Sequence, residues 1–73
     1  MYKFPRIKEL RESRNLTQLK CAEIFGVGKN TYIRYESGER VPTIDFMMNV
    51  AKYYGVSLDW LTEQVDSDVS EKH

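Results

Sequence analysis

Residues that begin and end α-helices recur at short intervals along this chain, and their spacing constrains the fold more than any other feature. Helix starts are expected at a proline and at hydroxyl side chains suited to N-capping: Pro5, Thr17, Thr43 and Ser57. Helix ends are expected at three glycines: Gly26, Gly38 and Gly55. No segment alternates apolar and polar residues with the period of two that is typical of a strand. The sequence therefore predicts an all-α fold of five short helices without a sheet.

Between these boundaries, apolar residues recur three and four positions apart, as they do on one face of a helix. The first helix is expected to end near residues 14–15, and the third to begin at residue 28 or 29. The last helix carries Leu58, Trp60 and Leu61. The residues expected to line the inner faces of the first four helices are Ile7 and Leu10; Cys21, Ala22 and Phe25; Thr31, Tyr32, Tyr35 and Glu36; and Ile44, Met47, Val50, Ala51 and Tyr54.

A chain of 73 residues with 41% apolar content suffices for one small domain, which we expect over residues 1–62. Residues 63–73 are polar and acidic without helical periodicity, and are expected to form a disordered tail. No run approaches the ~20 apolar residues of a membrane span. The single cysteine, Cys21, excludes a disulfide framework and fits the reducing cytoplasm.

The formal net charge of zero conceals a division of charge between the two halves of the chain. Residues 1–40 carry nine Lys and Arg against five Asp and Glu, a balance of +4. Residues 41–73 carry two against six, a balance of −4. Zero net charge by itself argues against nucleic-acid binding, which usually leaves a basic footprint. The basic first half is nevertheless suited to face a polyanion.

The junction between the second and third helices is the most specific pattern in the sequence. Two helices that cross steeply through a short turn need a small residue where their backbones approach and a glycine that takes positive φ in the turn. Ala22 meets the first need, and Gly26, four residues later, meets the second. Apolar residues stand at the offsets that such packing requires: Cys21, Phe25, Val27, Tyr32 and Tyr35. The pattern indicates a helix-turn-helix.

From Ile7 to Leu61 the chain resembles the lambda-repressor-like helix-turn-helix family, which includes Cro and many small bacterial regulators. The matching segments are Ile7–Glu12, Leu16–Gln18, Ala22–Glu23, Gly26–Val27, Tyr35–Gly38 with Pro42, and Tyr54–Leu61. The resemblance implies a transcriptional regulator, a repressor that binds double-stranded DNA with its third helix in the major groove. It also implies a homodimer on a palindromic operator, with half-sites about one helical turn (~34 Å) apart.

The resemblance places four residues of the third helix at base edges: Lys29, Asn30, Ile33 and Arg34. Their chemistry suits this role, because Lys29 or Arg34 can donate to guanine, Asn30 can pair with adenine and Ile33 can pack on a thymine methyl. The alternative for the polar three is an ordinary solvated helix face. For Ile33 it is packing against a neighbour.

Phosphate contacts are expected around the same helices, where they position the protein without reading sequence. Thr17 and Gln18 stand at the N-terminus of the second helix, where backbone amides and the helix dipole favour an anion. Thr17 is also expected to cap its helix, with or without DNA. The other candidates are Lys20, Ser37, Gly38 and Arg40.

Several residues are expected to be structural. The resemblance implies a partly buried ion pair between Arg11 and Glu36, which joins the first helix to the third. Cys21 replaces the leucine usual in the family and is expected to be a small buried hydrophobe. His73, the last residue, is not expected to form a site.

Four apolar residues stand where the family usually has polar ones: Leu19, Ile24, Phe46 and Met48. Either the core is wider than usual, or some of them form a contact surface. Trp60 is a candidate for a homodimer contact, because aromatic residues dominate such interfaces, and packing in the core is the alternative.

An enzyme is not expected, because the folded region lacks a histidine, a paired-carboxylate pocket and a glycine-rich phosphate loop. No cofactor or metal is implied. The competing function is a protein-interaction module on the same fold, an antitoxin or antirepressor-like partner that binds another protein through its exposed apolar residues.

Overall fold

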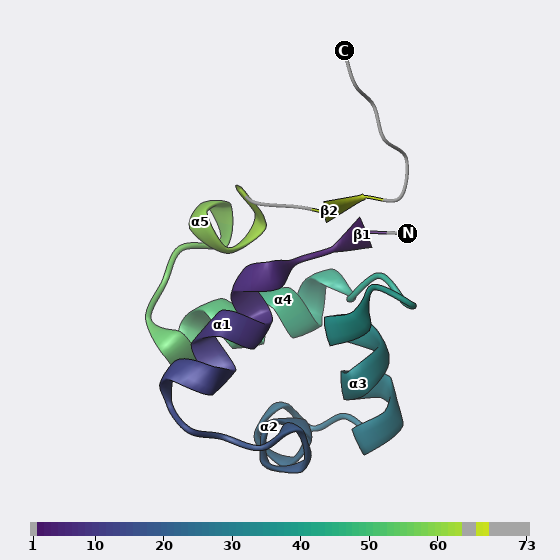
Figure 1. Ribbon diagram of the computed structural model, residues 1–73. Coiled ribbons are helices and arrows are strands. Elements are labelled where there is room, and N and C mark those ends of the chain that lie inside the picture. The colour runs from purple at the N-terminus through teal and green to yellow at the C-terminus, as the bar shows by residue number, and fades with distance from the viewer. Residues whose placement is uncertain (1, 64–65, 68–73) are drawn as a thin grey trace.

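The computed structural model describes residues 2–63 and 66–67. Within them the chain forms five helices: α1 (Pro5–Ser13), α2 (Gln18–Phe25), α3 (Lys29–Ser37), α4 (Ile44–Tyr54) and α5 (Leu58–Glu63). The expected all-α fold of five short helices is therefore confirmed (Figure 1). None of these helices is long and apolar enough to cross a membrane in the part of the chain that is described.

The helix boundaries lie where the capping residues predicted them. Thr17 Oγ1 accepts a hydrogen bond from the Lys20 backbone amide at 3.0 Å, and Ser57 Oγ accepts one from the amide of Trp60 at 3.0 Å. Thr43 caps α4 in the same way. Each hydroxyl satisfies a backbone donor that has no partner within its helix. Helices α2, α3 and α4 end at glycines in the left-handed conformation, as expected: Gly26, Gly38 and Gly55.

The core is an aromatic cluster centred on α4. The ring of Phe46 lies 4.6 Å from that of Tyr35, 5.6 Å from Phe25 and 6.1 Å from Tyr32, measured between centroids. Such tilted and edge-to-face pairs are the preferred arrangements of aromatic rings. The other buried apolar residues are Ile7, Cys21, Ala22, Met47, Val50, Ala51, Tyr54 and Leu61. Phe46 therefore belongs to the core, the first of the two alternatives that the sequence left open for this residue.

The expectation that Ile44 lies on the inner face of α4 is wrong, since this residue is 63% exposed. Five residues of α4 are buried: Phe46, Met47, Val50, Ala51 and Tyr54. At 3.6 residues per turn, Ile44 falls about 90° from the centre of the arc that they define. The spacing of apolar residues in the sequence is consistent with burial of Ile44. In the structure, Phe46 instead occupies the inner side of the first turn of α4.

The expectation that the fold has no sheet is also wrong in detail. Two strands, β1 (Tyr2–Lys3) and β2 (Asp66–Ser67), pair antiparallel, with Lys3 opposite Asp66 and Tyr2 opposite Ser67. Two-residue strands are too short to produce a period of two in the sequence. Part of the segment expected to be a disordered tail, residues 63–73, is thus in α5 and β2, whereas residues 64–65 and 68–73 lie outside the described residues.

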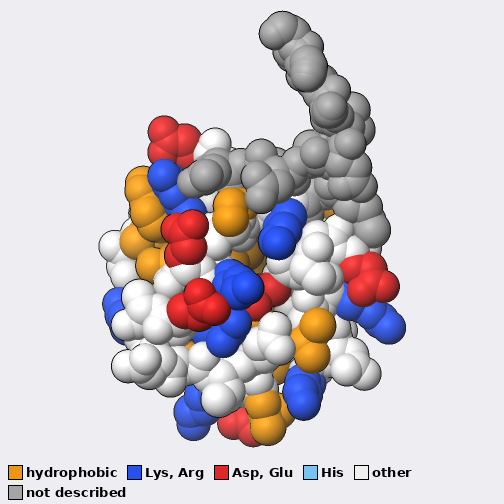
Figure 2. Space-filling view, viewed as in Figure 1, with side chains coloured by type: hydrophobic (Ala, Val, Ile, Leu, Met, Phe, Trp, Pro, Cys, Tyr) orange, Lys and Arg blue, Asp and Glu red, His pale blue; other side chains and the backbone are white. Residues whose placement is uncertain are grey.

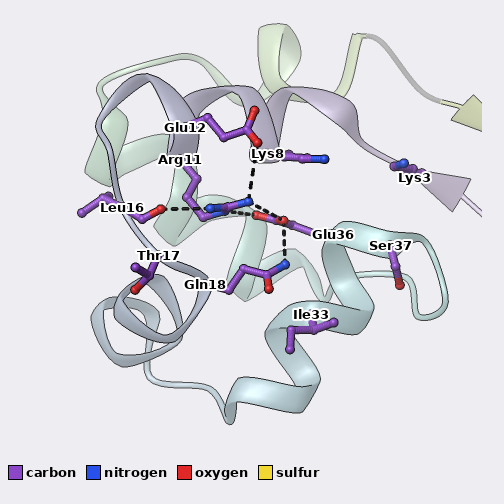
Figure 3. Close-up of a pocket in the computed structure, with 10 residues that line it drawn as sticks. All are labelled: Lys3, Lys8, Arg11, Glu12, Leu16, Thr17, Gln18, Ile33, Glu36 and Ser37. Carbon is purple, nitrogen blue, oxygen red and sulfur yellow. Dashed lines mark hydrogen bonds and ion pairs between the residues drawn. The ribbon is translucent and has the colours of Figure 1, made fainter.

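A network around the Glu36 carboxylate joins the first three helices (Figure 3). Arg11 of α1 donates from Nε to Glu36 Oε2 at 2.7 Å and from Nη2 to Oε1 at 3.3 Å, so the structure contains the expected ion pair. Gln18 of α2 donates from Nε2 to Glu36 Oε1 at 3.1 Å, and the Tyr32 hydroxyl donates to Oε2. Arg11 also donates to the Leu16 carbonyl oxygen at 2.9 Å. Both oxygens of the buried Glu36 carboxylate therefore accept hydrogen bonds.

The protonation states of this network follow from its surroundings. The hydrogen bond to Glu36 raises the pKa of the Arg11 guanidinium, so Arg11 is a cation in this pair. Burial raises the pKa of the Tyr32 phenol, and the Glu36 carboxylate beside it acts in the same direction. Tyr32 is therefore a neutral donor to a charged acceptor, which is among the stronger kinds of hydrogen bond.

Met47 and Met48 are neighbours on α4 with opposite environments, 4% and 54% exposed. Met47→Ala removes a buried side chain and leaves a cavity, so we expect the free energy of unfolding to fall by about 2–5 kcal/mol. Met48→Ala is the matched control and should change it by less than about 0.5 kcal/mol. Urea denaturation followed by circular dichroism measures both, and equal losses would contradict the assigned inner face of α4.

Glu36→Ala should reduce the free energy of unfolding by about 3–5 kcal/mol, because it leaves the Arg11 charge partly buried without its partner. Glu36→Gln keeps an acceptor oxygen and should lose less. Glu39→Ala is the control, since the side chain of Glu39 is 64% exposed and lies 4.0 Å from Arg34. Thermal and urea unfolding test these values. A surface change typically costs at most ~0.5 kcal/mol. If Glu36→Ala loses no more than this, the structural role of the Arg11–Glu36 pair is contradicted.

Candidate nucleic-acid interface

The turn between α2 and α3 has the geometry that a helix-turn-helix requires. Gly26 has a φ of 69°, in the left-handed region that favours glycine. The Val27 amide donates to the Ala22 carbonyl oxygen at 3.0 Å, which closes the end of α2. In Figure 1, α2 is seen nearly end-on and α3 from the side, so their axes cross steeply. Ala22 is buried in this crossing, as the sequence predicted.

Helix α3 has one buried and one exposed face. Tyr32, Tyr35 and Glu36 point into the core. The four candidates for base contact, Lys29, Asn30, Ile33 and Arg34, fall within one arc of about 140° on the other side. The three polar ones are exposed and Ile33 is half-buried. The structure thus brings together the residues predicted to read DNA, with Arg34 Nε 4.0 Å from Glu39 Oε1.

The predicted phosphate contacts divide into exposed cations and polar groups that already have partners. Lys20 and Arg40 are exposed. Thr17 is exposed, and its oxygen accepts the capping bond while its hydroxyl proton stays available to an anion. Ser37 Oγ donates to the Arg34 carbonyl oxygen at 3.2 Å.

Gln18 and Gly38 lie deeper than their predicted role suggests. The side-chain amide of Gln18 is directed to Glu36, so it belongs to the buried network, and Gly38 is buried at the end of α3. The sequence contains no signal of this hydrogen bond between residues 18 positions apart. Contact of any of these six residues with phosphate stays a prediction.

A basin of about 640 Å³ opens between α1, α2, α3 and β1 (Figure 3). The Arg11–Glu36 pair lies at its centre, and its other lining residues are Lys3, Lys8, Glu12, Leu16, Thr17, Gln18, Ile33 and Ser37. The basin therefore adjoins residues predicted to contact both bases and phosphates. The sequence prediction did not include Lys3 and Lys8. Lys8 has a signal, because it precedes Arg11 by three residues on one helix face, whereas Lys3 depends on the strand pairing.

The face in view in Figure 2 carries Lys and Arg side chains interspersed with Asp and Glu. This agrees with the charge balance of residues 1–62, which carry ten Lys and Arg against seven Asp and Glu, a small basic surplus of +3.

Trp60 lies at the edge of α5, 37% exposed. The guanidinium carbon of Arg6 lies 4.2 Å from the centre of the indole ring, and Arg6 Nη1 donates to the Trp60 carbonyl oxygen at 2.7 Å. Trp60 is thus not a core residue. Its indole ring is partly covered by the Arg6 guanidinium and is otherwise exposed.

The remaining apolar candidates for a contact surface separate by exposure. Leu19 is 50% exposed, Met48 is exposed as well, and Ile24 packs partly against the core. Ile24 borders a smaller hollow of about 380 Å³ between α2 and α4.

The structure offers no metal site among the residues it describes, since no three His, Cys, Asp or Glu side chains gather there. Cys21 is buried, as expected, with Sγ 3.6 Å from the hydroxyl of Tyr54. His73 lies outside the described residues.

Comparison with known proteins agrees with this geometry. Residues 7–61 match the helix-turn-helix family model. The cryptic phage CTXphi transcriptional repressor RstR of Vibrio cholerae is 39% identical over 67 residues, which are 92% of this chain and 60% of the relative. The HTH-type transcriptional regulator ImmR of Bacillus subtilis is 34% identical over 68 residues, which are 93% of this chain and 52% of the relative. This chain therefore spans between about half and three fifths of these relatives.

Among solved structures, the crystal structure of a transcriptional regulator from Listeria innocua resembles this fold with a TM-score of 0.77 and 26% identity. The match covers 97% of this chain and 67% of that one. The names of these relatives describe transcriptional regulators and a repressor, and none of them describes an enzyme. The chain belongs to the helix-turn-helix family, as its resemblance to the lambda-repressor-like proteins predicted.

Proposed function

We propose that this chain is a sequence-specific DNA-binding transcriptional regulator, a repressor whose helix α3 enters the major groove. The observation that carries the proposal is the outer arc of α3, where Lys29, Asn30 and Arg34 are exposed beside Ile33. Guanine, adenine and the thymine methyl are the partners that these side chains suit. The names of the family relatives support the same function.

The small excess of Lys and Arg over Asp and Glu in residues 1–62 bears on how the protein binds DNA. A protein that neutralises few phosphates has weak non-specific affinity, because counterion release supplies most of that affinity. Two copies on a palindromic operator double the number of contacts. We therefore propose a homodimer on DNA, with half-sites about one helical turn (~34 Å) apart and the exposed part of Trp60 in the dimer contact.

The competing function, a protein-interaction module, depends on an exposed apolar surface. Of the four residues proposed for it, Leu19 and Met48 are exposed, whereas Phe46 is in the core and Ile24 packs partly against it. The surface is therefore smaller than the sequence suggested. It remains the outcome to expect if no DNA sequence is selected.

Arg34→Ala should weaken binding to the preferred duplex by about 5- to 150-fold and relax the choice of base at one position, because a bidentate contact to guanine is lost. Selection from a random duplex library identifies the site for the wild type, and fluorescence anisotropy measures the affinities. Lys52→Ala on α4 is the control, since it also removes one exposed cation. Equal, feeble binding of the wild type to all sequences would defeat the proposal and favour the interaction module.

Two chains should bind each selected duplex, and the selected site should have two-fold symmetry. Trp60→Ala should shift the complex toward one chain per duplex at concentrations where the wild type binds as two. Tyr53→Ala, which truncates another exposed aromatic residue, should not. Sedimentation of the complexes measures the stoichiometry. Saturation of a symmetric site by one wild-type chain would contradict the dimer.

A further inference from the structure

The basin between α1 and α3 has more positive than negative lining residues. Lys3, Lys8 and Arg11 face Glu12 and Glu36, a balance of +1. Arg11 and Glu36 neutralise each other in the buried pair, and Arg11 Nη2 lies 3.9 Å from Glu12. The lysines therefore supply the excess, at the rim rather than at the centre.

Lys8 extends from α1 along the rim. Figure 3 shows Lys8 and Lys3 along one edge of the basin, across from Gln18 and Ile33. Among the side chains that the structure describes, no carboxylate lies within 4.0 Å of the Lys8 ammonium. An exposed lysine beside a concave surface is available to an anion.

Lys3 reaches the same rim because the strand pair holds it there. β1 pairs with β2 through Lys3 and Asp66, and β1 also contacts α3. Residues near the two ends of the chain thus place this lysine beside the helix proposed to read DNA.

The far side of the basin belongs to the surface already proposed to bind DNA. Thr17 and Ile33 line it there, whereas Ser37 lies at the end of α3 on the side of Lys3 (Figure 3). A phosphate group that approaches this surface has the Thr17 hydroxyl on one side and the lysine ammonium groups on the other. Such contacts to the backbone position a protein on the duplex and carry no sequence information.

We propose that Lys8 and Lys3 contact phosphodiester oxygens of duplex DNA, so that the DNA-binding surface extends from the helix-turn-helix onto α1 and β1. The inference rests on the proposed function, because it needs α3 in the major groove. It adds two phosphate contacts to those expected from the helix-turn-helix itself.

The test is the salt dependence of binding to the selected duplex and to a scrambled one, measured by anisotropy between about 50 and 200 mM salt. Lys8→Gln should weaken binding to both duplexes by the same factor and make the slope of log K against log [salt] shallower by about 0.9. The double variant Lys3→Gln with Lys8→Gln should reduce the slope by about 1.8. Lys8→Arg keeps the charge and should keep the slope.

Lys52→Gln on α4 is the matched control, because it removes the same charge from the hollow between α2 and α4 instead of the basin. If Lys8→Gln and the double variant match Lys52→Gln while the wild type selects a site, the inference is overturned and the proposed function stands. If the double variant reduces the slope no more than Lys8→Gln alone, the role of Lys3 is overturned. If the wild type binds no duplex, both proposals are overturned. Thermal melting of each variant checks that the fold is kept.

Discussion

The carboxylate of Glu36 is the point at which the three helices that carry the proposed DNA-binding surface are held together. Arg11, Gln18 and Tyr32 reach it from α1, α2 and α3, so one buried group sets their relative positions. A buried charge is costly unless it is paired and hydrogen-bonded, and this one has four donor contacts. Apolar packing alone tolerates small rotations of helices, whereas a network of directed bonds has one geometry. The outer arc of α3 is therefore presented at a defined angle.

The network also explains why the predicted interface and the core cannot be separated cleanly. Gln18 stands at the start of α2, where a phosphate contact is expected, yet its amide is directed inward to Glu36. Ile33 lies on the outer arc of α3 but borders the basin beside the buried pair. In a chain this small, the surface proposed to face DNA lies one side chain away from the core. A change to Gln18 or Ile33 is therefore expected to alter both stability and binding.

The sequence was sufficient for the features that depend on local chemistry. Thr17, Thr43 and Ser57 cap the helices they were expected to cap, and Gly26 ends α2, because these effects act within four residues. Features that depend on tertiary packing were not predictable in the same way. The apolar period of α4 suits Ile44 as well as Phe46, and only the position of the aromatic cluster decides which is buried. The β1–β2 pair and the place of Lys3 in the basin depend on residues more than 60 positions apart.

Arg6 and Trp60 connect α1 to α5 through a stacked cation and a hydrogen bond, far from the α2–α3 turn in sequence. A six-residue helix such as α5 is too short to be stable alone and relies on tertiary contacts, which include this docking and the burial of Leu61. Trp60 is also the single tryptophan of the chain. The intrinsic fluorescence of the protein is therefore a local probe of α5. Its emission reports whether α5 is packed against α1, and it does so independently of changes at α3.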